Sequence, residues 1–270
     1  MGPDDSVALF AHIRQTDPDR FWVCTAGGEP VGFGTGWVRG PLSFCGGLFV
    51  SPGWQGRGVG RRLFSLAMDG LPAAGGVAAL HSNAANPVSN RLYACNGIRP
   101  LYAFLNLVGP TTLPEGDAST RRTGLDAVPL DQGHLGILRE IDAAVLGTDR
   151  TLDHRWHLGV RRGTGWLFRR RGRAVGYAYL GGDGSRGQRA VGPVATLRPQ
   201  DLAPVLRFAL GELAALGVDR ALVNVPGPAE VAQALLWPAG FAFSGATGLF
   251  CASRPFGRFD RYLPAGYGLL

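Results

Sequence analysis

The sequence predicts an α+β protein made of two tandem domains with similar architecture. One order of helices and strands occurs twice along the chain. A polar stretch rich in turn-forming residues, 111–123, separates the two occurrences. The 270 residues are enough for two domains of ordinary size. We therefore expect a first domain at 1–110, a linker at 111–123 and a second domain at 124–270.

The first domain is expected to alternate short strands with amphipathic helices. Its patterns predict a helix at 5–15, two strands around a turn at 27–30, a strand at 42–50, a helix at 61–71, a strand at 77–82, a helix at 87–97 and a strand at 99–109. Gly97 is a typical helix-ending residue. The glycine pair at 46–47 indicates a bulge within its strand.

The second domain is expected to repeat this order. Its patterns predict helices at 134–146 and 150–158, strands at 164–170, 173–181 and 189–196, a helix at 201–216, a strand at 218–225, a helix at 228–237 and a strand pair at 240–253. The repeat is one of architecture more than of sequence.

Composition and cysteine usage exclude several protein classes. No apolar run approaches the ~18 residues that span a bilayer, and the N-terminus lacks the pattern of a signal peptide. The four cysteines are widely spaced with no CxxC pair, so we expect reduced thiols, a cytoplasmic protein and no metal site. The chain contains no lysine, and all 27 of its basic residues are arginine.

Positive charge is confined to the second part of the chain. Residues 1–120 carry 8 arginines and 8 acids, whereas residues 121–270 carry 19 arginines and 12 acids. An anionic partner such as nucleic acid would explain this excess, and so would a solvated surface. We favour the solvated surface, because the arginines do not alternate with aromatic residues and the run RRRGR at 169–173 falls at an expected turn.

The stretch LFVSPGWQGRGVGRRL at 48–63 carries the strongest functional signal. An apolar strand leads into a glycine-rich turn, and a helix follows at once. Glycines let backbone amides approach a ligand, and the helix dipole adds partial positive charge, so this is an anion-binding arrangement. The turn lacks the Gly-Lys-Ser/Thr ending of the nucleoside triphosphate loop, and its spacing is not GxGxxG.

Two motifs resemble the GNAT acyltransferase superfamily. QGRGVG at 55–60 matches Q/R-x-x-G-x-G/A, the loop that binds the pyrophosphate of acyl-CoA in that family. NPVSNRLYACNGI at 86–98 resembles its fourth-helix signature, with Asn86, Leu92, Tyr93, Gly97 and Ile98 in place. The resemblance covers 5–109 and lacks the family's first strand and first helix.

The resemblance implies two tandem GNAT-like domains, each a mixed, mostly antiparallel sheet flanked by helices. The second domain looks like a degenerate copy, because the turn at 195–206 has no glycine. We therefore expect only the first domain to bind acyl-CoA productively.

The resemblance also implies an N-acetyltransferase that uses acetyl-CoA as cosubstrate and a small-molecule amine as acceptor. The cofactor-binding candidates are Leu48, Phe49 and Val50 for the pantetheine arm, Gln55, Gly56, Arg57, Gly58, Val59, Gly60 and Arg61 for the pyrophosphate, and Asn86 and Tyr93. Tyr93 would also be catalytic, as the general acid that protonates the departing thiolate.

Some of these residues have simpler interpretations. Tyr93 could be a tyrosine at the edge of the core, and Asn86 before Pro87 is a typical helix cap. Strand 42–50 has no acidic residue, so His81 is the candidate base, although a structural histidine fits equally well. Acyl transfer through Cys45 or Cys95 is disfavoured, because no histidine is adjacent in sequence.

Two other functions stay open. The absence of an acid on the central strand motivates a non-catalytic acyl-CoA-binding or regulatory protein. The basic second domain motivates a nucleic-acid-associated protein, which we consider less favoured. We expect no membrane partner, and the sequence is compatible with a monomer or a homodimer.

Overall fold

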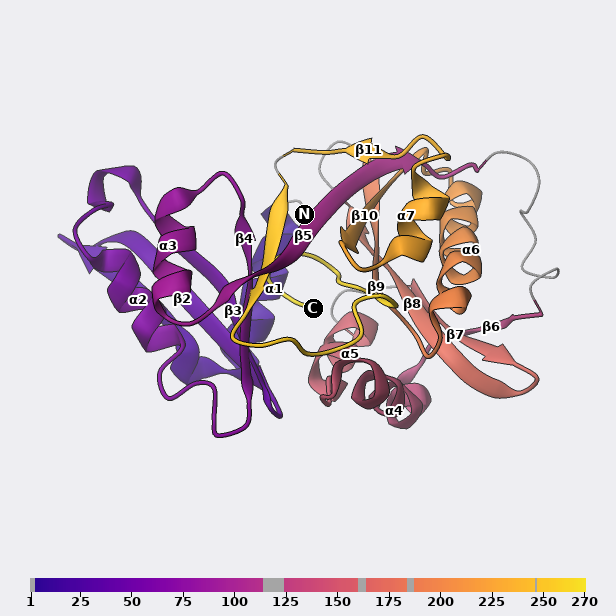
Figure 1. The fold of residues 1–270 in the computed structure, drawn as a ribbon, viewed down its shortest axis with the longest axis horizontal. Helices are drawn as coiled ribbons and strands as arrows, with labels where there is room; N and C mark the ends of the chain where they lie inside the picture. The colour runs from indigo at the N-terminus through magenta and orange to yellow at the C-terminus, as the bar shows by residue number, and fades with distance from the viewer. Residues whose placement is uncertain (1–2, 114–123, 160–163, 184–186, 246) are drawn as a thin grey trace.

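The computed structural model of the chain describes residues 3–113, 124–159, 164–183, 187–245 and 247–270 (Figure 1). Its α-helices are α1 (Pro3–Thr16), α2 (Val59–Ala67), α3 (Pro87–Cys95), α4 (Leu135–Leu146), α5 (Thr151–Gly159), α6 (Leu202–Ala215) and α7 (Glu230–Leu236). Its strands are β1 (Phe21–Ala26), β2 (Glu29–Arg39), β3 (Leu42–Val50), β4 (Val77–Asn83), β5 (Arg99–Pro110), β6 (Asp126–Pro129), β7 (Thr164–Arg170), β8 (Arg173–Asp183), β9 (Gln188–Thr196), β10 (Arg220–Pro226), β11 (Ala242–Phe243), β12 (Gly248–Ala252) and β13 (Tyr262–Leu263).

These strands form one mixed sheet within the described residues. Their order is β1-β2-β3-β4-β12-β5-β10-β9-β8-β7-β6, with β11 beside β5 and β13 beside β9. The pairs β3–β4 and β9–β10 are parallel, and the other pairs are antiparallel. The predicted α+β architecture, with mixed and mostly antiparallel pairing flanked by helices, is confirmed.

The predicted helices and strands are present, with small shifts at their ends. Strands β3 and β7 have the predicted bounds, and α1 extends the helix expected at 5–15. The sequence did not indicate β6 or β13, because runs of four and two residues are too short to show an alternating pattern.

Strand β12 crosses from the end of the chain into the middle of the sheet. It lies between β4 and β5 and is antiparallel to both. Strand β5 in turn pairs with β10 and β11. The strand pair expected at 240–253 is therefore split, because β11 and β12 contact different parts of β5. The division at 110 and 124 stays a prediction, and most of the linker, 114–123, lies outside the described residues.

Helices α2 and α3 cover one face of the part of the sheet that contains β1 to β4, and α1 packs on the other face against β2 and β3. In Figure 1, α2 and α3 lie together at the left, whereas α4 and α5 lie below the centre, where α4 packs on β8 and β9. Helix α2 packs closely on β2 because three alternate residues there are glycine. A Cβ added at Gly34 or Gly36 would lie 3.0 Å or 2.5 Å from a backbone oxygen of α2, and one at Gly32 would lie 3.3 Å from the Leu63 side chain.

The opposite face joins the two predicted domains through one apolar core. Leu9 and Ile13 of α1 pack in the same buried cluster as Ile141 of α4, Trp156 of α5 and Leu269 near the end of the chain. Burial of such side chains contributes roughly 1.5–3 kcal/mol each.

A buried ionic network lies at the same junction. The Asp153 carboxylate of α5 accepts hydrogen bonds from His12 at 3.0 Å, from Arg39 at 2.8 and 3.0 Å, and from Arg150 at 3.2 Å. Burial alone would raise the pKa of Asp153, but the two guanidinium groups and the His12 bond hold it far below its usual value. Asp153 is therefore ionised, and it ties α1 and β2 to α5.

Candidate active site

Strands β3 and β4 diverge after a short parallel stretch. They pair from Leu42 with Val77 to Cys45 with Leu80, and not beyond. β3 continues beside β2 as far as Val50, and β4 continues beside β12 as far as Asn83. We call the gap between residues 46–50 of β3 and 81–83 of β4 the first wedge. Within the described residues, no strand pairs with 46–50 on its β4 side.

A bulge marks the apex of the first wedge. The register between β2 and β3 shifts where Thr35 pairs with Gly47 and Gly36 pairs with Cys45, which leaves Gly46 as the extra residue. The predicted bulge at 46–47 is confirmed. A bulge bends its strand, so it accounts for the departure of β3 from β4 at this point.

The glycine-rich loop leads from β3 to the open N-terminus of α2. Gly56 and Gly58 have φ angles of 73° and 82°, a left-handed conformation that favours glycine. A Cβ at either position would meet no atom within 4 Å. Gly58 precedes α2 and offers no side-chain cap, and the first turn contains no acid. The first amides of α2 are thus available to an anion.

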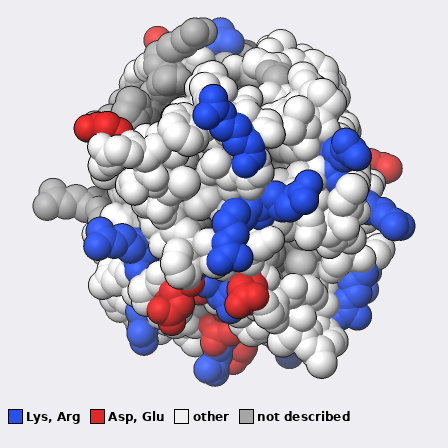
Figure 2. All heavy atoms as spheres, turned by 90° about the vertical axis from the view of Figure 1, so that its left-hand side faces the viewer, with Lys and Arg blue, Asp and Glu red and all other residues white. Residues whose placement is uncertain are grey.

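Contacts within the loop fix it against the end of β3. The Gln55 side chain donates a hydrogen bond to the Val50 carbonyl oxygen at 3.0 Å. The Arg57 guanidinium lies 5.0 Å from the centre of the Trp54 ring. Arg57, Arg61 and Arg62 are exposed. Figure 2 views the end of the molecule where α2 and α3 lie, with arginine side chains across its centre and acidic side chains grouped below them.

Helix α3 places Asn86 and Tyr93 beside the first wedge. Asn86 caps the helix, because its side chain accepts a hydrogen bond from the Ser89 amide at 3.2 Å. Tyr93 is 7% exposed and packs on Phe64 of α2, with 5.4 Å between ring centres. Burial, together with the nearby Cys45 and Cys251 thiols, raises the pKa of Tyr93 above its usual value. The phenol therefore holds its proton at neutral pH.

The cysteines show no sign of nucleophilic activation. All four are unpaired. Burial raises the pKa of the Cys45 thiol to about 12, so it stays protonated and unreactive at neutral pH. Cys95 is exposed at the end of α3. This chemistry agrees with the expectation that acyl transfer does not pass through Cys45.

His81 is the first residue of β4 beyond the stretch that pairs with β3, and its side chain lies among aromatic rings. Its ring stacks on Phe104 at 4.0 Å and contacts Phe44, Phe250 and Tyr267. Its Nδ1 lies 3.0 Å from the Tyr267 carbonyl oxygen, which can only accept, so Nδ1 carries the proton. Burial lowers the pKa of His81 to about 4. The ring is therefore neutral, and the lone pair of Nε2 has no partner among the described residues.

A second buried polar atom that has no partner in the described part of the chain lies near the apex. The Thr35 hydroxyl is fully buried, and Thr35 pairs with Gly47 at the bulge. An unsatisfied buried polar group costs roughly 1–3 kcal/mol, so a ligand that bonds to it gains that energy.

The end of the chain contributes residues that the sequence did not indicate. The Gly268 carbonyl oxygen accepts a hydrogen bond from Trp37 Nε1 at 2.9 Å, and a Cβ added at Gly268 would lie 2.9 Å from the Gly46 oxygen. Tyr267 contacts His81. Segment 267–268 thus packs on the apex of the first wedge. Because Tyr267 is 186 positions from His81, no local pattern could have revealed this contact.

The second part of the sheet contains a similar gap that the chain itself fills. β9 and β10 pair in parallel up to Val191 and Val223, and beyond this the two strands separate. We call the gap between 192–196 and 224–226 the second wedge. Strand β13 pairs with β9 there, opposite Val194 and Ala195. The Asn224 side chain of β10 donates a hydrogen bond to the Ala265 carbonyl oxygen at 3.1 Å.

Helix α6, which follows the second wedge, differs from α2 because its N-terminus is not open to an anion. The buried Asp201 lies at the start of α6 and accepts a hydrogen bond from Arg170 at 2.6 Å. A carboxylate at this end of the helix repels a phosphate, because it already occupies the positive end of the helix dipole.

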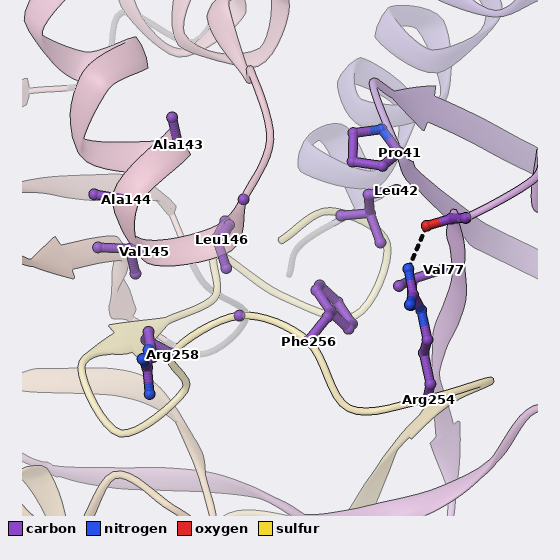
Figure 3. A pocket seen from close by; sticks show the side chains of 13 residues that line it. Pro41, Leu42, Val77, Ala143, Ala144, Val145, Leu146, Arg254, Phe256 and Arg258 are labelled. Carbon is purple, nitrogen blue, oxygen red and sulfur yellow. Dashed lines mark hydrogen bonds between the residues drawn. The ribbon is translucent and has the colours of Figure 1, made fainter.

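A separate pocket lies at the opposite ends of β3 and β4 (Figure 3). It has a volume of about 350 Å³ between the strand starts at Leu42 and Val77 and the end of α4. Figure 3 shows Arg254 reaching the Gly75 carbonyl oxygen across one side of this pocket. The pocket is distinct from the first wedge, because it lies where β3 and β4 are still paired.

Comparison with known proteins identifies the architecture. Residues 2–97 match the model of the Acetyltransferase (GNAT) family. The chain has the GNAT fold. The resemblance that the two motifs indicated is confirmed by this match and by solved structures of GNAT acetyltransferases.

Three solved structures illustrate the GNAT fold of the whole chain. A candidate acetyltransferase from Pyrococcus horikoshii is 19% identical with a TM-score of 0.71, and the match covers 100% of this chain and 87% of that one. A fungal glucosamine N-acetyltransferase region is 15% identical with a TM-score of 0.67, covering 92% of this chain and 34% of that one. A tandem GNAT protein from the clavulanic acid biosynthesis pathway is 17% identical with a TM-score of 0.57, and the match covers 92% of this chain and 88% of that one.

These likenesses show the GNAT fold and leave the substrate open, because all three identities are low. No curated protein matches the sequence. No helix in the described part of the chain is long and apolar enough to cross a membrane.

Proposed function

We propose that the protein transfers an acetyl group from acetyl-CoA to the amine of a small-molecule acceptor. One observation carries the proposal: β3 leaves β4 after Cys45, and its unpaired edge at 46–50 leads into a loop that ends at the open N-terminus of α2. An unpaired strand edge can bind an amide-containing chain, and a helix N-terminus can bind phosphate. The pantetheine arm and the pyrophosphate of acetyl-CoA offer these two chemistries in this order.

Each part of the cosubstrate then has a protein partner. Leu48, Phe49 and Val50 bind the pantetheine arm as an added strand, and a backbone amide there polarises the thioester carbonyl. The pyrophosphate lies on the amides of the loop and of α2, whose candidate residues are Gln55, Gly56, Arg57, Gly58, Val59, Gly60 and Arg61. Asn86 combines its capping role with a contact to the arm.

Two side chains are candidates for proton transfer. The nitrogen of the acceptor attacks the thioester carbonyl, the C–S bond breaks, and the thiolate leaves. Tyr93 gives its proton to this thiolate, since its raised pKa keeps it protonated until then. His81 accepts, at Nε2, the proton that the amine loses, since the Nε2 lone pair has no partner among the residues that the structure describes. With a pKa of about 4, His81 is a weak base.

A specific observation supports a second candidate function, the binding of acyl-CoA without turnover. β3 has no acidic residue, and Nε2 of His81 is buried among rings. Such a protein would sense or store acyl-CoA. In both cases we propose a cytoplasmic protein, which the unpaired thiols support.

Release of the CoA thiol tests the proposal and separates the two functions. Purified protein is incubated with acetyl-CoA and a panel of amines, and free thiol is measured over time. Amine-dependent release, with acetylated amine seen by mass spectrometry, supports the acetyltransferase. Acetyl-CoA binding with no release for any amine supports the binding protein.

A further inference from the structure

We propose that the segment 262–268 completes the acceptor side of the first wedge and that Tyr267 selects the amine. The inference rests on the proposed acetyl transfer. It gives the second part of the sheet a role, which is to hold this segment in place.

The second wedge anchors the segment. Tyr262 and Leu263 pair with β9 as β13, and both side chains are fully buried. Pro264 lies close to β9, because a Cβ added at Gly192 would be 2.7 Å from the carbonyl oxygen of Pro264. The Asn224 side chain fixes Ala265. Four residues of the segment are thus held by β9 and β10 before the chain reaches the first wedge.

The anchored segment places the Tyr267 side chain over β12 and β5, beside His81 on the β4 side of the first wedge. The Tyr267 ring packs edge-on against Phe104 at 5.2 Å and against His81 at 5.7 Å. Its hydroxyl accepts a hydrogen bond from Asn106 of β5 at 2.7 Å. Tyr267 as a whole is nevertheless 37% exposed. One side of it is therefore fixed by the protein, and the other is open to a ligand.

A second group of rings lies on the β3 side of the apex. Phe10 of α1 packs next to Gly47, and Phe33 lies 5.1 Å from both Phe10 and Phe49. Phe49 is 60% exposed. Phe33 and Phe49 are paired across β2 and β3, so their side chains share the face that α1 covers. An acceptor that approaches the apex on this face meets rings on both sides.

The chemistry of these two groups favours an amine with a flat, apolar body. In the described part of the chain, the ring contacts and hydrogen bonds of these two groups involve no Asp or Glu side chain. A polycationic amine would leave its second ammonium desolvated without a counter-charge. An aromatic ring stacks on Tyr267 instead.

The test compares 2-phenylethylamine with putrescine as acceptors, by thiol release at saturating acetyl-CoA. The wild-type protein should prefer 2-phenylethylamine, measured as the ratio of the two kcat/KM values. Tyr267→Ala should reduce that ratio by about tenfold through a higher KM for 2-phenylethylamine. The affinity for acetyl-CoA should not change, because the loop and β3 are untouched.

Three further variants show whether the ring itself is responsible. Tyr267→Phe keeps the ring and should keep the ratio within about twofold. Tyr267→Leu keeps apolar bulk, is less disruptive than alanine, and should still lower the ratio. Phe243→Ala is the control, because Phe243 is 57% exposed and lies on β11, away from the first wedge. If Tyr267 had a merely structural role, its replacement would lower the thermal stability and would lower both kcat/KM values by the same factor.

The outcomes separate this inference from the proposed function. A ratio unchanged in both Tyr267→Ala and Tyr267→Leu overturns the inference, as does a wild-type preference for putrescine or no transfer to 2-phenylethylamine. In each case acetyl-CoA binding and transfer to another amine would leave the proposed function standing. A wild-type protein that fails to bind acetyl-CoA would overturn both.

Discussion

At the residue scale, the proposed transfer depends on two side chains on opposite faces of the sheet. Tyr93 lies among the residues packed under α2 and α3, whereas His81 lies among rings on the face covered by α1 and the end of the chain. The thioester at the apex would lie between them. An acid on one face and a base on the other can serve the leaving thiolate and the attacking amine without competing for one proton.

Replacing Tyr93 by phenylalanine tests the acid. Tyr93→Phe should lower kcat by about 100-fold, because it removes the proton donor and preserves the packing on Phe64. Calorimetry should show an unchanged Kd for acetyl-CoA. Tyr102→Phe is the matched control, since the buried Tyr102 hydroxyl has no partner among the described residues. Full turnover in Tyr93→Phe would remove Tyr93 from the mechanism.

The lowered pKa of His81 predicts a pH dependence of stability. Its pKa is about 4 when folded, against about 6.5 in an unfolded chain, so the unfolded state binds the proton more tightly. The free energy of unfolding should therefore fall as the pH drops from 6.5 to 4, by about 3 kcal/mol from this residue. Urea unfolding across this range measures it. The free energy of unfolding of His81→Asn should fall less than that of the wild type between pH 6.5 and 4. If the two proteins lose the same free energy over this range, His81 does not have the lowered pKa.

At the scale of elements, the loop from β3 and helix α2 form the proposed anion site. Gly58 has open space around it and no side-chain cap, so a new carboxylate there would face the bound pyrophosphate. Gly58→Glu should weaken acetyl-CoA binding at least 100-fold while the fold survives, because the cost of a left-handed non-glycine residue is only roughly 1–3 kcal/mol.

The other end of α2 provides the control for this variant. Gly70 also has a positive φ angle, 66°, and no atom within 4 Å of an added Cβ. Gly70→Glu therefore introduces the same charge and a comparable strain beyond the C-terminal end of the helix. Acetyl-CoA titrations should show near wild-type affinity for Gly70→Glu. Equal losses in both variants would mean that general charge or strain is responsible, and not the site.

Sequence patterns predicted the elements well because their signals are local. The loop at 55–60, the glycine pair at 46–47 and the capping residue Asn86 all act within a few residues, and the structure has them as expected. The insertion of β12 beside β4 and the contact of Tyr267 with His81 join distant parts of the chain. Such pairings follow from how the whole sheet assembles, which no short pattern records.

At the scale of the whole molecule, the two predicted domains share strands, a core and a buried ionic network. β5 pairs with β12 on one side and with β10 on the other, so the sheet continues from one part to the next. Asp153 of α5 holds His12 and Arg39 from the first part of the chain. We expect the chain to unfold as one cooperative unit for these reasons.

Loss of the central carboxylate tests this cooperation. Asp153→Ala leaves Arg150 buried without its carboxylate and leaves Arg39 with Asp17 alone, which should lower the free energy of unfolding by about 3 to 5 kcal/mol. Denaturant unfolding followed by tryptophan fluorescence and by circular dichroism measures it. Asp149→Ala is the control, because Asp149 is exposed and its carboxylate bonds locally, accepting a hydrogen bond from the Thr151 amide at 2.8 Å. A loss below 1 kcal/mol in Asp153→Ala would contradict the role of the network.

We propose that the chain binds one acetyl-CoA, in the first wedge, while β13 and Asp201 close the second wedge. A calorimetric titration of the wild-type protein with acetyl-CoA, read for stoichiometry and repeated with Gly58→Glu, tests this directly. We expect one site per chain in the wild type and no site in Gly58→Glu. Two sites per chain, or one site that survives Gly58→Glu, would contradict the proposal.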